Sequence, residues 1–341
     1  MKKIRSVAPL RIGFGGGGTD LDSYCDRFGG YVLNATISLK VHCFIEPKNN
    51  KKIIFSSPDY KEFVEIDSMK ELKLNGEMDL HKGVYNKIVK HFNLEPLSFE
   101  MITYSDAPPG GSGLGGSSTL IVSMIKSFAE WLNLPLGEYD IAKLAYDIER
   151  KEIGIEGGSQ DQYASTFGGF NFMEFYSNER VIVNPLRIKN KILSELESST
   201  ILYFTDIVRQ ASQIEKEKKL LMENKKSIEA MHQVKEDAVL MKNSILSGDI
   251  TSFAKYLHKS WLAKKTVTDS ISNTEIDRIY NIAIENGAIG GKVSGAGGGG
   301  FMFFITSPEK KFNLIKILNN EKGQVYNFQF VQNGAESWKI S

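Results

Sequence analysis

The sequence predicts an α+β fold in two domains, and three observations support this class. The chain has 341 residues, which suits two domains at roughly 100–200 residues each. Residues 35–45 alternate between apolar and polar side chains, as in a half-buried strand. Residues 228–245 place apolar side chains every three or four positions, as on one face of a helix. Because strand and helix patterns occur in separate runs, we expect an α+β protein with domains at residues 1–185 and 186–341.

The first half begins with strand patterns and continues into helices. The predicted helix at 80–92 has Leu80, Val84, Ile88 and Phe92 on one face, four residues apart. The predicted strands of this half are residues 35–45, 52–56, 63–66, 99–104, 170–175 and 181–183. The predicted helices are residues 80–92, 117–132 and 138–152.

The second half starts with helices. The charged helix at 228–245 could bind a partner, but a core-facing apolar stripe under a solvated face is the favoured interpretation. The next helix, near 275–286, stops at Gly287, a residue type that commonly follows a helix C-cap. A strand at 301–306, a helix near 309–318 and a strand near 325–331 complete the chain.

Composition excludes several classes of protein. Forty-two Lys and Arg against 41 Asp and Glu give a net charge of +1, so no broad positive field attracts nucleic acid or an acidic membrane. Two cysteines, Cys25 and Cys43, exclude a disulfide scaffold, and five scattered histidines argue against zinc. No apolar run reaches the ~18–20 residues that a bilayer span needs. We therefore expect a cytoplasmic protein with no nucleic-acid or membrane partner.

Glycine is the unusual component, and much of it lies in three clusters within residues 13–18, 110–116 and 287–300. Without a Cβ atom, consecutive backbone N–H groups can converge on an anion such as phosphate. The G-x-G-x-x-G pattern occurs in all three clusters but lacks the strand and acidic residue of a Rossmann site. A P-loop also fails, because Val293 follows Lys292 where Ser or Thr is required.

The remaining candidate is the loop at 108–118, which leads directly into the helix predicted at 117–132. A helix N-terminus adds free N–H groups and a positive dipole end, so we interpret this loop as a polyphosphate-binding loop. The structural alternative is a flexible turn with Ser as the helix N-cap.

Three segments in order along the chain carry family motifs. Ala8–Asp20 reads A-P-L-R-I-G-F-G-G-G-G-T-D, Pro109–Ser118 reads P-G-G-S-G-L-G-G-S-S, and Lys292–Gly300 reads K-V-S-G-A-G-G-G-G. These segments resemble the three motifs of the GHMP kinases, a family of small-molecule kinases that includes galactokinase and mevalonate kinase. The resemblance extends across nearly the whole chain.

The resemblance implies both a fold and an activity. The fold would be an N-terminal α+β domain with a left-handed βαβ crossover, a C-terminal ferredoxin-like domain and an active site between them. The activity would be ATP-dependent phosphorylation of a sugar, with ATP and Mg²⁺ as cofactors. Gly17 and Gly18 stand where galactokinases have Glu-His, which leaves room for a bulkier or phosphorylated sugar.

Within the family, Gly17, Gly18 and the additional Gly116 are most similar to the heptose 7-phosphate kinase branch. That branch phosphorylates the anomeric O1 of D-glycero-D-manno-heptose 7-phosphate on the way to nucleotide-activated heptose. The alternatives are a fucose-type or galactose-type C1 kinase and a non-catalytic family member that senses sugar and ATP. The expected partner is thus a small sugar phosphate, and the oligomeric state stays open, a homodimer included.

The resemblance also implies roles for individual residues. Asp161, in a segment similar to the family's G-x-x-D-Q, would be the catalytic base, and Arg11 would keep it ionised and stabilise charge on the transferred phosphoryl group. Glu149 and Ser117 would hold Mg²⁺, with Ser118 as the alternative hydroxyl. Structural alternatives are an Asx-turn for Asp161, a surface strand position for Arg11 and a solvent-facing ion pair for Glu149.

The nucleotide and sugar would be bound by the glycine motifs. The nucleotide-binding residues expected are Pro109, Gly110, Gly111, Ser112, Gly113, Leu114, Gly115, Gly116, Ser117 and Ser118. The sugar-binding residues expected are Gly16, Gly17, Gly18, Thr19 and Asp20, with Gly295, Ala296 and Gly297 on the other side of the cleft. As an alternative role, Thr19 and Asp20 could cap a helix that begins near Leu21.

Overall fold

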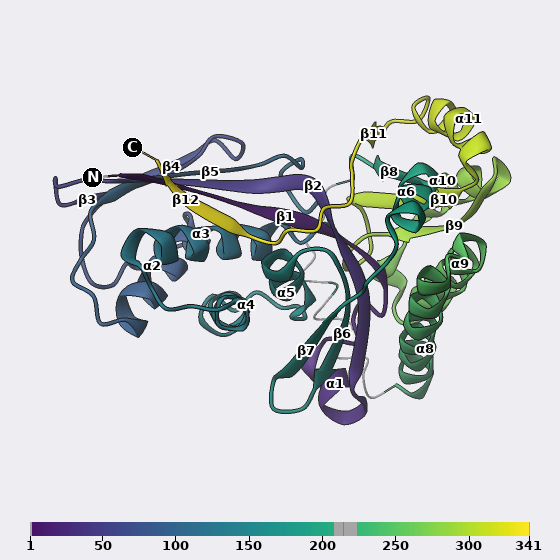
Figure 1. Cartoon of the computed structure of the whole chain (residues 1–341), viewed down its shortest axis with the longest axis horizontal. Coiled ribbons are helices and arrows are strands. Elements are labelled where there is room, and N and C mark those ends of the chain that lie inside the picture. Colours follow the sequence, from purple (N-terminus) through teal and green to yellow (C-terminus); the bar gives the residue numbers. More distant parts are fainter. Residues whose placement is uncertain (1, 208–213, 215–223, 341) are drawn as a thin grey trace.

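The described strands form two sheets, and the larger one organises the N-terminal part of the molecule (Figure 1). The computed structural model describes residues 2–207, 214 and 224–340. The larger sheet has the order β12-β1-β2-β5-β3-β4, with β6 beside β2 and β7 beside β6. Its strands are β1 (Lys3–Gly15), β2 (Gly30–Pro47), β3 (Lys52–Ser57), β4 (Glu62–Asp67), β5 (Phe99–Ser105), β6 (Phe170–Tyr176), β7 (Arg180–Pro185) and β12 (Glu336–Ile340).

The central strand β2 is much longer than the 35–45 segment predicted from alternation. Residues 30–35 pair with β6, residues 41–47 pair with β5, and β1 runs beside both parts. The register of β1 against β2 shifts between Pro9 and Arg11, and such an irregularity can re-aim a side chain. A proline lacks the N–H that a regular ladder requires, so this is a suitable place for the shift.

Helices cover one face of the larger sheet, as Figure 1 shows. They are α2 (Asp79–His91), α3 (Gly116–Leu132), α4 (Glu138–Tyr146) and α5 (Gln160–Phe167). Phe99 and Met101 of β5 share one apolar core with Ile88 of α2 and Phe128 of α3. Burying each such side chain contributes about 1.5–3 kcal/mol, which holds the helices on the sheet.

One predicted helix divides in two. The periodicity predicts a single helix over 138–152, but α4 ends at Tyr146 and the chain continues as a π-helical turn over Asp147–Glu152. A π-helical turn shifts the side chains that follow it, and such turns occur frequently at functional sites. Glu149 lies in this turn.

The smaller sheet belongs to the C-terminal part and has the order β11-β8-β10-β9, with all pairs antiparallel. Its strands are β8 (Thr200–Phe204), β9 (Ala288–Val293), β10 (Phe301–Thr306) and β11 (Gln324–Tyr326). The accompanying helices are α6 (Asn190–Ser199), α8 (Lys225–Ser247), α9 (Ile250–Lys265), α10 (Thr274–Glu285) and α11 (Pro308–Leu318). In chain order these strands lie as fourth, first, third and second, which confirms the expected ferredoxin-like arrangement.

The end of the chain returns to the larger sheet. The strand predicted over 325–331 is only partly present, because β11 ends at Tyr326 and Phe330 makes a single bridge to Ile37. Beyond it, β12 pairs with β1, so the two ends of the chain lie side by side (Figure 1). The division at residues 185 and 186 stays a prediction.

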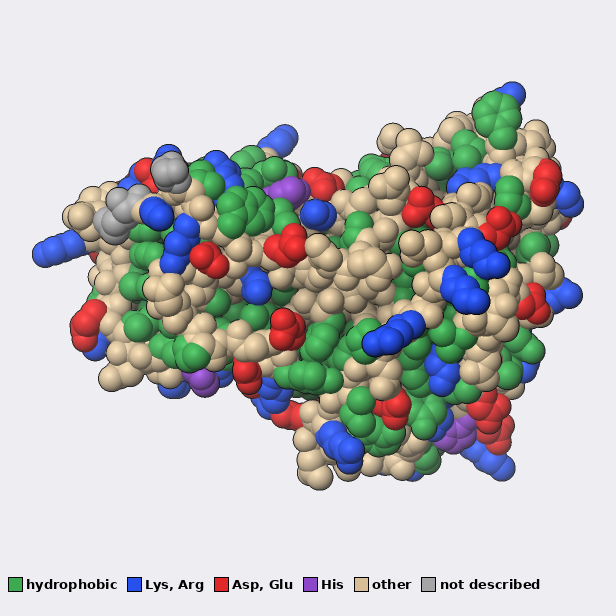
Figure 2. All heavy atoms as spheres, viewed as in Figure 1, with side chains coloured by type: hydrophobic (Ala, Val, Ile, Leu, Met, Phe, Trp, Pro, Cys, Tyr) green, Lys and Arg blue, Asp and Glu red, His purple; other side chains and the backbone are tan. Residues whose placement is uncertain are grey.

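Three further expectations concern the whole chain. Cys25 and Cys43 are both buried and unbridged. Among the described helices, none combines the length and apolarity that crossing a bilayer requires. Acidic and basic side chains are interspersed over the face shown in Figure 2, in keeping with the net charge of +1.

Candidate active site

The three glycine clusters meet at a cleft of about 540 Å³, and Gly17, Gly113 and Gly295 all line it. The loops touch backbone to backbone. A Cβ atom on Gly295 would lie 2.8 Å from the carbonyl oxygen of Gly113, and one on Gly300 would lie 2.5 Å from that of Ser112. Side chains at these positions would push the loops apart, which is why the sequence has glycine there.

The second glycine cluster opens into α3 without a side-chain cap. Gly115 is the N-cap residue and has a left-handed φ of 80°, so the alternative of a Ser N-cap is wrong. The first turn therefore keeps N–H groups that no capping side chain occupies, as an anion-binding helix N-terminus requires. A Cβ atom on Gly115 would lie 3.1 Å from the carboxyl carbon of Asp161, so this loop directly contacts the predicted base.

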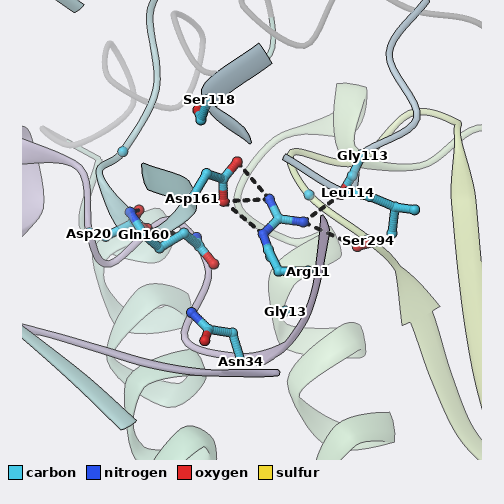
Figure 3. Close-up of polar contacts among 12 residues, drawn as sticks. Arg11, Gly13, Asp20, Asn34, Gly113, Leu114, Ser118, Gln160, Asp161 and Ser294 are labelled. Atoms are coloured by element: carbon cyan, nitrogen blue, oxygen red, sulfur yellow. Dashed lines mark hydrogen bonds and ion pairs between the residues drawn. The ribbon is translucent and has the colours of Figure 1, made fainter. Parts of the chain in front are cut away.

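Arg11 and Asp161 form a partly buried two-point ion pair (Figure 3). Arg11 Nε donates to Asp161 Oδ1 at 2.7 Å, and Nη2 donates to Oδ2 at 2.8 Å. Nη1 donates to the carbonyl oxygen of Gly113 at 2.6 Å, which ties the pair to the glycine loop. Arg11 is only 3% exposed, so the surface alternative is wrong for it. Such two-point contacts fix the orientation of both groups.

Asp161 is helical rather than part of a loop. It occupies the first turn of α5, where the positive end of the helix dipole stabilises a carboxylate. The Asx-turn alternative is therefore wrong, and the carboxylate lines the cleft.

Glu149 is fully buried, which overturns the solvent-facing alternative. Ser117 Oγ donates to its Oε1 at 2.7 Å, Ser118 Oγ donates to Oε2 at 2.6 Å, and Gln162 Nε2 donates to Oε2 at 2.7 Å. The Arg150 guanidinium lies 3.3 Å from Oε1. The π-helical turn thus places a carboxylate directly beneath the start of α3.

This donor set suits Mg²⁺, which prefers oxygen ligands and usually keeps water and substrate phosphates in its shell. In the part of the chain that the structure describes, no group of three or more His, Cys, Asp or Glu could hold a metal ion. One carboxylate with two hydroxyls is consistent with a site completed by phosphate and water. Ser117 is exposed toward the cleft, whereas Ser118 is 1% exposed.

Asp20 braces the start of α5 instead of capping α1 (Asp22–Phe28). Its carboxylate accepts from Gly18 N at 3.0 Å, Gln160 N at 3.1 Å and Gln160 Nε2 at 3.2 Å. The helix that the sequence predicts near Leu21 exists, but its N-cap, Leu21, makes no side-chain bond. Asp20 therefore joins the first glycine motif to the segment that carries Asp161.

The Thr19 hydroxyl bonds the backbone of the first glycine motif and of β2. It donates to the carbonyl oxygens of Gly16 and Tyr31, at 2.7 and 2.9 Å. Some of the expected binding residues shape the loops without lining the cleft. They are Gly16, Thr19, Pro109, Gly110, Leu114 and Gly297, whereas the other expected loop residues line it.

Four residues of this site were not predicted from the sequence. Arg150 donates to the carbonyl oxygens of Ile155 and Gly158 and so holds the segment before α5. Gln160 and Gln162 flank Asp161 and contact Asp20 and Glu149. Lys264 of α9 lines the cleft and donates to the carbonyl oxygen of Gly295 at 2.9 Å. Gln160 and Gln162 flank Asp161 in the sequence, so their position could have indicated a place in the site. Lys264 lies in an ordinary charged helix, which gives no such indication.

Comparisons with known proteins agree with this geometry. The family model described as GHMP kinases N terminal domain matches residues 79–169, and the one described as GHMP kinases C terminal matches residues 240–324. Together these models match slightly more than half of the chain.

Individual relatives extend the match to the full length. A D-glycero-alpha-D-manno-heptose 7-phosphate kinase from Campylobacter jejuni is 58% identical over 340 residues, which is 100% of both chains. A crystal structure of a D-glycero-D-manno-heptose 1-phosphate kinase from Bacteroides thetaiotaomicron is 45% identical, with a TM-score of 0.86 over 99% of both chains. A galactokinase structure from Lactococcus lactis shares the fold at 18% identity, with a TM-score of 0.77 over 98% of this chain and 95% of that one.

Proposed function

Because the chain belongs to the GHMP kinase family, we propose that it phosphorylates the anomeric O1 of D-glycero-D-manno-heptose 7-phosphate with ATP, giving the 1,7-bisphosphate. The chain is a sugar kinase, a phosphotransferase with an alcohol group as acceptor. The observation that carries the finer proposal is the 58% identity over the whole of both chains to the Campylobacter jejuni enzyme.

Asp161 is the catalytic base of this proposal. Its carboxylate lines the cleft beside the glycine loop of α3. As the sugar O1 forms a bond to the γ-phosphorus, the O1 proton passes to the carboxylate of Asp161. The bond from the γ-phosphorus to the bridging oxygen of ADP breaks, and ADP leaves. Proton transfer to a positioned carboxylate contributes typically about 10²–10⁴-fold to a rate.

Arg11 positions the base and adds positive charge next to the phosphates. Two of its nitrogens hold both oxygens of Asp161, and the third reaches the carbonyl oxygen of Gly113. Phosphoryl transfer depends mainly on positioning and charge stabilisation, which a fixed guanidinium supplies without reorganisation.

We further propose that Glu149 and Ser117 hold Mg²⁺, with Ser118 and Gln162 orienting the carboxylate from behind. A bound Mg²⁺ would neutralise charge on the β- and γ-phosphates. Both serines line the cleft, and Ser117 is favoured because it is exposed there whereas Ser118 is buried.

The test is ADP release by the purified protein with Mg·ATP across a panel of sugars. The panel contains D-glycero-D-manno-heptose 7-phosphate, sedoheptulose 7-phosphate, mannose, fucose and galactose. We expect strong turnover on the heptose phosphate alone, with the new phosphate found on O1 by NMR. Turnover on fucose or galactose instead would make the chain another sugar kinase of the family. Binding of sugar and ATP without any turnover would point to a sensor.

A further inference from the structure

A buried lysine from the C-terminal half lines the cleft beside Gly17 and Gly295, two of the residues expected to bind the sugar. Lys264 occupies the last turn of α9 and is 3% exposed, yet it lines the cleft. Its ammonium group donates to the carbonyl oxygen of Gly295. Lys264 therefore places a buried positive charge at the wall of the substrate cleft.

Lys264 and Asp161 are connected by one chain of contacts along the cleft. Asp161 contacts Arg11 at 2.7 Å, and Arg11 contacts the carbonyl oxygen of Gly113 at 2.6 Å. That oxygen lies 2.8 Å from the Cβ position of Gly295, whose own carbonyl oxygen accepts from Lys264 at 2.9 Å. Each of these residues lines the cleft.

A second chain of contacts connects the same two residues on the other side. Gln160 directly precedes Asp161, and its Nε2 lies 3.7 Å from the Cβ position of Gly17. Lys264 Nζ lies 3.6 Å from that same position. The two chains of contacts close a ring of seven residues, in which Gly295 and Lys264 lie farthest along it from Asp161, and Lys264 is the one of these two that carries a side chain.

A sugar inside this ring would present opposite ends to the two residues. If its O1 faces Asp161, its far end would lie at Lys264, beside Gly17. Any side chain at Gly17 would occupy the space between Lys264 and Gln160. The far end of a heptose 7-phosphate carries a phosphate dianion, and lysine binds phosphate as a compact point charge.

We propose that Lys264 binds the phosphate group of the acceptor sugar and so makes the enzyme select a phosphorylated sugar. This inference rests on the proposed function and assigns the recognition of the substrate's own phosphate to one side chain. Lys264 is a specificity residue in this proposal, distinct from the base at the other end of the sugar.

The decisive variant is Lys264→Gln, which keeps an N–H donor for the carbonyl oxygen of Gly295 but removes the charge. We expect kcat/KM for heptose 7-phosphate to fall about 10- to 100-fold, in line with the loss of a charge-assisted hydrogen bond. The value for unphosphorylated heptose should change less than about threefold. Lys264→Arg should preserve most of the selectivity, because it keeps the charge.

Lys292 offers a matched control. It is also a buried lysine, 5% exposed, whose ammonium donates to a backbone carbonyl, that of Gly13 at 2.8 Å, but it does not line the cleft. Lys292→Gln should lower kcat/KM for heptose 7-phosphate and for unphosphorylated heptose by the same factor. A parallel loss in Lys264→Gln, or a loss confined to the KM for ATP, would overturn the proposal.

A measurement on the unmodified protein covers the case in which the variants fail to fold. Inorganic phosphate should raise the KM for heptose 7-phosphate and leave the KM for ATP unchanged. Competition with ATP alone would overturn the assignment of Lys264. If the unmodified enzyme does not turn over heptose 7-phosphate at all, the proposed function fails and not merely this assignment.

Discussion

The two sides of the cleft are built by different means. The first wall, made of α3, the π-helical turn and α5, is held by hydrogen bonds between charged and polar side chains, such as those on Asp161 and Glu149. The second wall, residues 294–301 with the end of α9, meets the glycine loop that precedes α3 largely through backbone contacts such as Phe301 N to Ser112 O at 2.8 Å. The second wall also contains one charged side chain that lines the cleft, Lys264, which donates to the carbonyl oxygen of Gly295.

This difference suggests that the first wall supplies the reacting groups and that the second wall sets the width of the cleft. Substitutions in the first wall remove charges aimed at the reaction, so they should act on kcat. Substitutions of glycines in the second wall add atoms between two backbones, so they should act on stability and on the width of the cleft. Three measurements can break or sharpen this contrast.

The largest effect is expected from Asp161→Asn in the first wall. The amide cannot accept the O1 proton, so kcat should fall about 10²–10⁴-fold. Steady-state ADP release measures this effect. Asp59→Asn is the control, because Asp59 lines the same cleft but bonds Ser57 and the backbone of Ser105. Equal losses in both variants would contradict the role of Asp161.

The second expected effect is on stability, from Gly300→Ala in the second wall. Gly300 has φ 76°, and its new Cβ would meet the carbonyl oxygen of Ser112 at 2.5 Å. Gly154→Ala is matched to it, because Gly154 has φ 80° and open space around its Cβ position. Both variants incur the left-handed strain of about 1–2 kcal/mol.

Overpacking should cost Gly300→Ala roughly 1–3 kcal/mol more than Gly154→Ala. Urea unfolding of the two variants measures the difference. If both lose the same free energy of unfolding, the backbone contact between the two loops is not tight.

The third expected effect is a pH dependence of stability from His81 of α2, which lines the cleft and bonds Thr103 Oγ1 at 2.9 Å. Burial lowers the pKa of the His81 imidazole to about 3. An unfolded chain binds this proton near pH 6.5 while the folded state excludes it. The stabilising contribution is therefore full above about pH 6.5 and is lost as the pH falls toward 3, at up to about 1.4 kcal/mol per pH unit.

Urea unfolding between pH 7 and 4 measures the slope. As the pH is lowered from 7 to 4, the free energy of unfolding should decrease less steeply in His81→Gln than in the unmodified protein. Identical slopes would mean that the imidazole takes up its proton at the same pH in the folded state as in the unfolded chain.

Much of the secondary structure could be predicted from local patterns. Alternation found part of β2, and the spacing of Leu80, Val84 and Ile88 found α2, because these periodicities come from burial of one face. Local patterns missed β12, whose edge position depends on pairing with β1 from the other end of the chain. They also missed the division of 138–152, because a π-helical turn retains nearly the same apolar spacing.

The sequence by itself determined the three glycine motifs and predicted Arg11, Asp161 and Glu149 as site residues. Arg11 and Asp161 lie in short segments with a recognisable pattern, and Glu149 was predicted from its position 12 residues before Asp161. Only the tertiary structure decided how these residues meet. It joined Arg11 to Asp161 across 150 positions of sequence and turned Asp20 toward α5 instead of α1.

Lys264 depended entirely on the tertiary structure. Its sequence neighbourhood is an ordinary charged helix, and its place in the cleft comes from the packing of α9 beside the third glycine motif. A residue that works together with its neighbours in sequence, as Arg11 and Asp161 do in their motifs, can be identified from a local sequence pattern. A group that acts because distant segments close around it leaves no such pattern, since long-range contacts depend on the packing of the whole chain.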